Sequence, residues 1–289
     1  MSRPLPSGRP RTWATRSSDE RAPGAGRALH WSIAVLNVVF ATALLVVTAL
    51  IAVQPADERP WSAGVIAAAG LAGVAWLVVG ISFHRNYLHV PPPDERKVTL
   101  TSVDGEPAVV MAWRRTFQRQ PLLIACVVVA AGLALTAVLA ADGNPGWWLA
   151  LVFVVPVAPF LPDRFVEATR PVRLVLTPRG IGAAGPEGDA WLDWDDVRGI
   201  ARERDNQWWV IRVVGVDDAP SWRFRRRPRI LWARTPPRPW IDVPGPAFTV
   251  EPVHVIEAIA HYRRTPAARA ELATETGRRR VAGPPAAFR

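Results

Sequence analysis

Apolar residues are gathered into four long blocks that carry no formal charge, and the charged residues lie in the segments between them. A helix of roughly 20 apolar residues crosses a bilayer core about 30 Å thick. The blocks have about that length, so the pattern predicts an integral membrane protein, and it excludes a single soluble globule or a disordered chain. We expect transmembrane helices over about 29–53, 62–82, 121–141 and 146–162.

The last block differs from the others because its second half contains three prolines: Pro156, Pro159 and Pro162. Proline removes a backbone donor and kinks a helix, although packed membrane helices tolerate it. The basic residues still favour four crossings, since residues 1–28 hold six arginines and 83–120 hold six basic residues, whereas 54–61 hold one and 142–146 hold none. The positive-inside rule therefore predicts a multi-pass protein of the inner membrane with both termini and the 83–120 loop in the cytoplasm.

The predicted spans contain no Asp, Glu, Lys or Arg. Transporters and proton pumps usually place ionisable residues at membrane depth, so a small transporter or channel is an alternative hypothesis here and not the leading one. Small residues spaced four apart, at Ala69 and Gly73 and at Gly132 and Thr136, predict close contacts between helices.

Two of the polar segments are expected to lack stable structure, and one is expected to form strands. Residues 1–28 and 273–289 are rich in Arg, Pro and Gly without apolar periodicity, which predicts disordered tails. Within 83–120, the runs Val98–Val103 and Ala108–Trp113 flank a turn-like Asp-Gly and predict a hairpin. An isolated hairpin is marginal in water, so we expect it to pack on the C-terminal domain or on the membrane surface.

The segment 163–272 is predicted to be a β-rich domain that ends in a helix over Pro252–Tyr262. Proline is favoured at the first helical position, which fits a helix that begins at Pro252. Alternating apolar residues between turn signals predict the strands. They cover Val172–Thr177, Ile181–Ala184, Ala190–Trp194, Trp208–Val216, Ser221–Phe224, Arg229–Trp232 and Pro239–Val243.

The composition and the motif content mainly exclude kinds of site and classes of function. The formal net charge is +10, and 34 of the 35 basic residues are arginine, which is typical of a high-GC genome. The single cysteine, Cys126, excludes an intrachain disulfide. No phosphate-binding loop, nucleophile elbow or zinc-protease helix is present, and we interpret Asp193, Asp195 and Asp196 as a strand end and helix cap. We therefore expect no enzyme, no cofactor and no metal site.

Three motifs resemble a known family. The segments are Leu176–Gly180, with a leucine–threonine–x–x–glycine pattern; Trp191–Val197, with a tryptophan–aspartate pair; and Ile259–Arg269. Together they resemble the pleckstrin-homology-like (PH-like) domains of membrane-anchored proteins from high-GC Gram-positive bacteria. The resemblance implies a partly open antiparallel β-barrel or sandwich capped by a C-terminal helix. It also implies binding of lipids, peptides or proteins, with no catalysis.

The strongest candidate site is an arginine-rich segment interleaved with aromatic residues. Its members are Trp222, Arg223, Phe224, Arg225, Arg226, Arg227 and Arg229. One interpretation is a loop whose arginines contact anionic phospholipid while Trp222 and Phe224 enter the interface. The other is a solvated basic hairpin without a ligand, and tethering to a membrane disfavours nucleic acid.

The sequence thus predicts a four-helix membrane region joined to a cytoplasmic β-rich PH-like domain with a C-terminal helix. The function expected of it is binding or scaffolding at the inner face of the membrane. Anionic lipids are the expected partner, with a protein partner or a homo-oligomer as alternatives.

Overall fold

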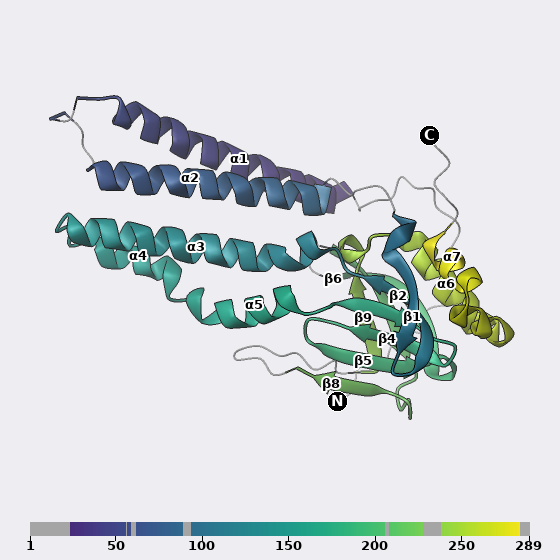
Figure 1. Cartoon of the computed structure of the whole chain (residues 1–289). Coiled ribbons are helices and arrows are strands. Elements are labelled where there is room, and N and C mark those ends of the chain that lie inside the picture. Colours follow the sequence, from purple (N-terminus) through teal and green to yellow (C-terminus); the bar gives the residue numbers. More distant parts are fainter. Residues whose placement is uncertain are drawn as a thin grey trace, which may run out of the picture.

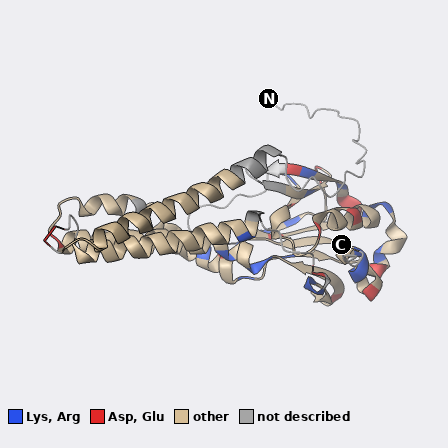
Figure 2. Cartoon of the chain, turned by 90° about the horizontal axis from the view of Figure 1, so that it is seen from above, with Lys and Arg blue, Asp and Glu red and all other residues tan. Residues whose placement is uncertain are grey.

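The computed structural model describes residues 24–55, 57–58, 62–88, 94–205, 208–227 and 238–283. A set of long helices extends from one end of a β-rich region (Figure 1). Most Lys, Arg, Asp and Glu residues lie in the β-rich region or where the helices meet it, and the helices are otherwise almost free of charge (Figure 2). The chain therefore divides into an apolar part and a charged part.

Three helices are long and apolar enough to cross a membrane: α1 (Gly24–Ala52), α2 (Ala63–Phe83) and α3 (Arg115–Ala141). Helices of membrane length thus cover the first three expected spans. A Cβ atom added to Gly73 would lie 2.9 Å from the Leu45 side chain, and one added to Gly132 would collide with Val154. Both glycines therefore lie at helix contacts, as the small-residue spacing predicted.

Helix α1 begins within the tail that was expected to be disordered. It includes residues 24–28, because Ala25, Arg27 and Ala28 are good helix formers that extend an existing helix at little cost. The rest of that predicted tail, residues 1–23, lies outside the described residues.

The expected fourth span is not a single membrane-length helix. The chain forms α4 (Trp147–Val154), a turn, the short 3₁₀ helix η3 (Ala158–Phe160) and then α5 (Leu161–Thr169). Pro156 and Pro159 have no N–H to continue the ladder, so the helix breaks between α4 and η3. The broken segment still runs back along α3 to the β-rich end (Figure 1).

The strands form two antiparallel sheets. A six-stranded sheet has the order β1-β2-β3-β4-β5-β8, and a three-stranded sheet has the order β6-β7-β9. The strands are β1 (Val98–Val103), β2 (Glu106–Ala112), β3 (Arg173–Leu176), β4 (Gly180–Ala184), β5 (Gly188–Asp193), β6 (Val197–Asp205), β7 (Trp208–Gly215), β8 (Arg223–Arg226) and β9 (Trp240–Pro244). The predicted strands thus appear with small shifts, β6 was not predicted, and the strand expected at Arg229–Trp232 lies outside the described residues.

The hairpin of the inter-span loop is part of the larger sheet. Strand β2 pairs with β3, with Val109 opposite Leu176 and Met111 opposite Leu174, and all four side chains are fully buried. The expected docking on the C-terminal domain is therefore observed. The β-rich region is built from two separate parts of the chain, about 94–114 and 170–283, so the expected 163–272 boundary leaves out two of its strands.

Helix α6 (Pro252–Arg264) covers the core shared by the sheets. Its Tyr262 is fully buried, and the Tyr262 ring centroid lies 6.1 Å from that of Trp194, which is 1% exposed. The Trp194 indole also donates a 2.8 Å hydrogen bond to the carbonyl oxygen of Thr177. The core is thus closed by residues from a strand end and from the C-terminal helix.

The expected disordered tail at 273–289 is wrong for most of its length. After the 3₁₀ helix η6 (Pro266–Ala273), residues Glu275–Ala282 form α7. Leu272 and Val281 are fully buried, and the Arg278 guanidinium lies 3.4 Å from the carbonyl oxygen of Val98 in β1. Leu272 and Val281 are too widely spaced to give a periodic pattern in the sequence, but they complete the core. Residues 284–289 lie outside the described part.

Candidate membrane-surface site

The arginine-rich segment forms β8, the last strand in the order of the six-stranded sheet. Arg223 lies opposite Trp191 of β5, and Arg225 lies opposite Asp189. Since side chains alternate along a strand, Arg223 and Arg225 point to one face of the sheet and Arg226 to the other. Arg223, Arg225 and Arg226, here called the β8 arginines, are all exposed.

The other members of the segment are engaged within the β-rich region. Arg227 forms a 2.6 Å ion pair with Asp189, which leaves 14% of its side chain exposed. Trp222 packs against the core and stacks on Phe224, with ring centroids 6.2 Å apart. The Phe224 ring lies against Gly188, where an added Cβ would be 2.7 Å away. Arg229 lies outside the described residues.

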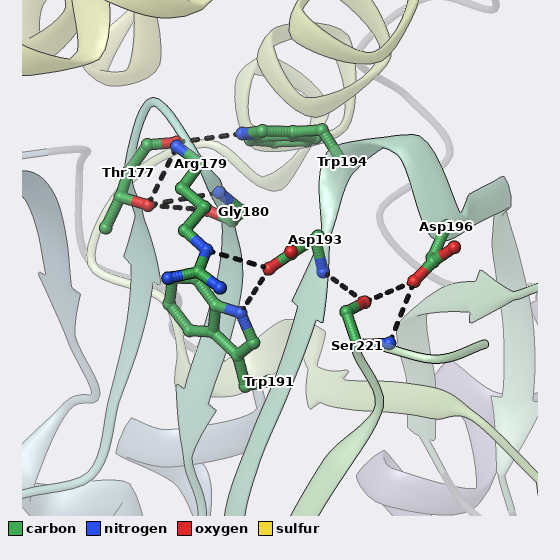
Figure 3. Close-up of polar contacts among 8 residues, drawn as sticks. All are labelled: Thr177, Arg179, Gly180, Trp191, Asp193, Trp194, Asp196 and Ser221. Atoms are coloured by element: carbon green, nitrogen blue, oxygen red, sulfur yellow. Dashed lines mark hydrogen bonds and ion pairs between the residues drawn. The ribbon is translucent and has the colours of Figure 1, made fainter.

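A polar network holds the chain just before β8 in place (Figure 3). The Ser221 backbone N–H donates to the Asp196 carboxylate (3.0 Å), and the Asp193 N–H donates to the Ser221 hydroxyl (3.0 Å). The Asp193 carboxylate accepts a 2.7 Å hydrogen bond from the Trp191 indole and pairs with Arg179 at 3.5 Å. These two aspartates therefore position the strand. Asp193 ends β5, as predicted, and it precedes the 3₁₀ helix Trp194–Asp196 without a capping hydrogen bond from its side chain.

The register fixes which end of β8 lies near the helices. Strand β3 begins just after α5, which packs on α3, so the start of β3 is at the helical end of the sheet. Strand β5 runs parallel in direction to β3, and its first residue, Gly188, lies opposite Arg226. Arg226 is therefore at the helical end of β8.

Three polar residues that the sequence analysis did not single out join α3 to its surroundings. Gln118 donates to the carbonyl oxygens of Glu167 and Arg170 at the end of α5, the latter at 2.5 Å. The Arg114 guanidinium donates to the carbonyl oxygen of Arg85 (3.0 Å), and its burial lowers the Arg114 pKa. Gln120, 2% exposed, accepts a 2.7 Å hydrogen bond from Asn86.

These contacts tie the helices to the β-rich region through backbone carbonyls. The Arg114 N–H also donates to the carbonyl oxygen of Ala247 (2.8 Å), and the Trp113 N–H to that of Val172 (2.9 Å). The direction of the sheet relative to the helices is therefore set by several hydrogen bonds. The sequence signal for these junction contacts is that amide side chains lie at the ends of the uncharged apolar segments.

Ion pairing distinguishes the β8 arginines from other arginines of the β-rich region. Arg212 pairs with Asp242 at 2.7 Å, Arg269 with Asp195 at 2.7 Å and Arg278 with Glu275 at 2.6 Å. Within the described part of the chain, the β8 arginines have no ion-pair partner. Exposed guanidinium groups of this kind can form bidentate hydrogen bonds with a phosphate.

The described residues contain no group of three or more His, Cys, Asp or Glu side chains that could hold a metal ion. The exposed guanidinium groups of the β8 arginines can bind an anion. Comparison with protein-family models, with curated proteins and with solved structures finds no match to this chain.

Proposed function

We propose that this protein is a multi-pass inner-membrane protein whose β-rich region binds anionic phospholipid headgroups at the cytoplasmic face through the β8 arginines. The observation that carries the proposal is the position of Arg226 at the helical end of the sheet, together with the absence of ion-pair partners for the β8 arginines among the described residues. Each basic residue near an anionic membrane surface contributes about 1 kcal/mol to binding.

The proposed topology has four crossings. The broken segment α4–η3–α5 supplies the fourth, and packed membrane helices tolerate such proline breaks. Figure 1 supports this topology, because the segment returns the chain to the end where α2 also terminates. The positive-inside rule then puts the β-rich region in the cytoplasm.

The proposed domain type is PH-like. Two antiparallel sheets and a helix that covers their shared core support this assignment, and so do the motifs at Leu176–Gly180 and Trp191–Val197. A fold alone does not assign a function, so the proposed lipid binding rests on the arginine surface.

Hydrogen–deuterium exchange of the full chain in nanodiscs tests the proposal. In nanodiscs that contain phosphatidylglycerol, we expect the amides of 223–227 to exchange more slowly than in pure phosphatidylcholine, and salt should reduce the difference. The variant R225Q/R226Q should abolish it. The control R264Q/R279Q removes the same charge from α6 and α7 and should preserve it. Equal exchange in both lipids at low salt would refute the proposal.

A small transporter or channel is a second candidate function. The break between α4 and η3 favours it, because interrupted helices at membrane depth expose backbone carbonyls that can coordinate ions. Its test is ion flux into proteoliposomes that contain the full chain. Flux equal to that of empty vesicles would remove this candidate.

A further inference from the structure

A second group of arginines, none of them in β8, lies where the helices meet the β-rich region. These helix-end arginines are Arg85, Arg115, Arg119, Arg170 and Arg173. The three segments that hold them, 84–88, 114–120 and 161–173, contain seven arginines, two acidic residues and no lysine, so their formal charge is 7 − 2 = +5. The three segments also lie together in the structure, because the Arg114 guanidinium donates to the carbonyl oxygen of Arg85 and the Gln118 amide donates to that of Arg170.

None of the helix-end arginines has an ion-pair partner within the described ranges. Arg115 and Arg119 are exposed, lie four apart in the first turns of α3, and no acidic residue accompanies them in the first turn. Like charges at this spacing repel, and positive charge at a helix N-terminus opposes the helix dipole. The protein thus maintains an unfavourable charge arrangement that an anion would relieve.

An apolar track continues from these two arginines toward the far end of α3. Cys126 follows Arg119 by seven residues and Leu133 follows by fourteen, so all three lie along one stripe of the helix. Cys126 is exposed, and Leu133 is 49% exposed. On α5, which contacts α3, Phe165 is 60% exposed. A cationic end above an exposed apolar track matches a molecule with a phosphate and acyl chains.

We propose that the cytoplasmic end of α3 is a binding site for an anionic phospholipid. Arg115 and Arg119 hold its phosphodiester, the other helix-end arginines surround the headgroup, and an acyl chain lies along Cys126 and Leu133. The apolar track selects a lipid over a free phosphate ion. This inference rests on the membrane embedding in the proposed function, and it is independent of the β8 arginines.

The test uses Cys126, the only cysteine of the chain, as a fluorescent probe of the track. The full chain is labelled there with bimane and reconstituted in phosphatidylcholine that contains increasing amounts of brominated lipid, which quenches on contact. Each arginine near an anionic lipid contributes about fivefold to binding. For Arg115 and Arg119 together, we therefore expect half-maximal quenching at a roughly 25-fold lower fraction of brominated phosphatidylglycerol than of brominated phosphatidylcholine.

The variant R115Q/R119Q should remove this preference, and R119Q alone should reduce it if the double variant does not fold. The variant R225Q/R226Q should keep the preference, which separates this site from the proposed function of β8. Inorganic phosphate, compared with chloride at equal ionic strength, should not relieve the quenching by brominated phosphatidylglycerol. Equal quenching by both brominated lipids in the unmodified chain, or relief by phosphate, would overturn the inference.

Discussion

The two parts of the molecule contain similar kinds of apolar residue, but the helical part exposes them and the β-rich part buries them. In the helical part, Leu36 is 69% and Leu71 is 70% exposed, whereas in the β-rich part Ile211 and Leu192 are fully buried. The β-rich part therefore carries its own core, whereas the helices expose an apolar surface of the kind that membrane-spanning helices present to lipid. Arginines follow the same division, because ion pairs are common within the β-rich part and absent at the helix-end arginines in the described structure.

The largest expected effect concerns the continuity of the β-rich part. A fragment of residues 163–272 lacks β1, β2 and α7, and with them buried Val98, Val109, Met111 and Val281. We expect it to show no cooperative thermal unfolding by near-ultraviolet circular dichroism. The matched fragment joins 94–114 to 170–283 by a short Gly-Ser linker and should fold, since Trp113 and Val172 are hydrogen-bonded neighbours. Cooperative unfolding of the shorter fragment would contradict the described architecture.

The loss of a buried tryptophan in the β-rich part can be compared with the loss of an exposed tryptophan in the helical part. Trp194→Ala removes a buried indole, and we expect a loss of about 3–5 kcal/mol in the free energy of unfolding. Trp148→Ala removes an indole that is 55% exposed in the helical part and should cost far less. Both losses in the free energy of unfolding can be measured by denaturant unfolding in detergent, with the protease resistance of the β-rich part as the readout. Equal losses would show that the two parts do not differ in this way.

The junction between the two parts should show a smaller, coupled effect. Asn86→Leu or Gln120→Leu leaves one buried amide without its partner, and polar pairs between membrane helices couple by about 0.6–1.7 kcal/mol. In a double-mutant cycle, the combined loss should therefore be less than the sum of the single losses. Thr48→Val, whose hydroxyl donates within its own helix, should combine additively with Gln120→Leu.

The smallest effect is confined to alkaline pH. Burial, assisted by nearby Glu271, raises the pKa of Tyr262 above its ordinary value of 10.0. Because the folded-state pKa is the higher one, the stability linked to this group is present below pH 10 and is lost as the pH rises through the folded-state pKa. Thermal unfolding from pH 9 to 12 should show a shallower decline for Tyr262→Phe. The same decline in Tyr262→Phe and the unmodified chain would contradict this assignment, and Tyr87→Phe is the control.

Local patterns in the sequence predicted most elements, and the failures have non-local causes. Strand β6 contains Arg202, Glu203, Arg204 and Asp205, which read as a loop, but it forms because it pairs along its length with apolar β7. Helix α7 looks like an arginine-rich tail, and only Val281 and Ala282 reveal its buried face. For the fourth span, the sequence shows the prolines that break the helix, but it does not show at which residue the helix begins again.

The sequence predicted which residues make up the candidate site, but it did not predict how they are arranged in the fold. The arginines of β8 stand out in the sequence, yet the partner of Arg227 is Asp189, 38 residues away. The position of Arg226 at the helical end of the sheet depends on the β3–β4–β5 register and on the hydrogen bonds of Gln118 and Arg114. These are tertiary relations that no local pattern encodes.

Site-specific quenching tests directly whether the helical end of the six-stranded sheet, where Arg226 lies, faces the membrane. In a Cys126→Ser background, Arg226→Cys and Ser102→Cys place a single probe at the helical end of β8 or at the exposed turn end of β1. Headgroup-labelled quencher lipids in anionic vesicles should quench the probe at 226 strongly and the probe at 102 weakly. Equal quenching at both positions, or stronger quenching at 102, would contradict the account.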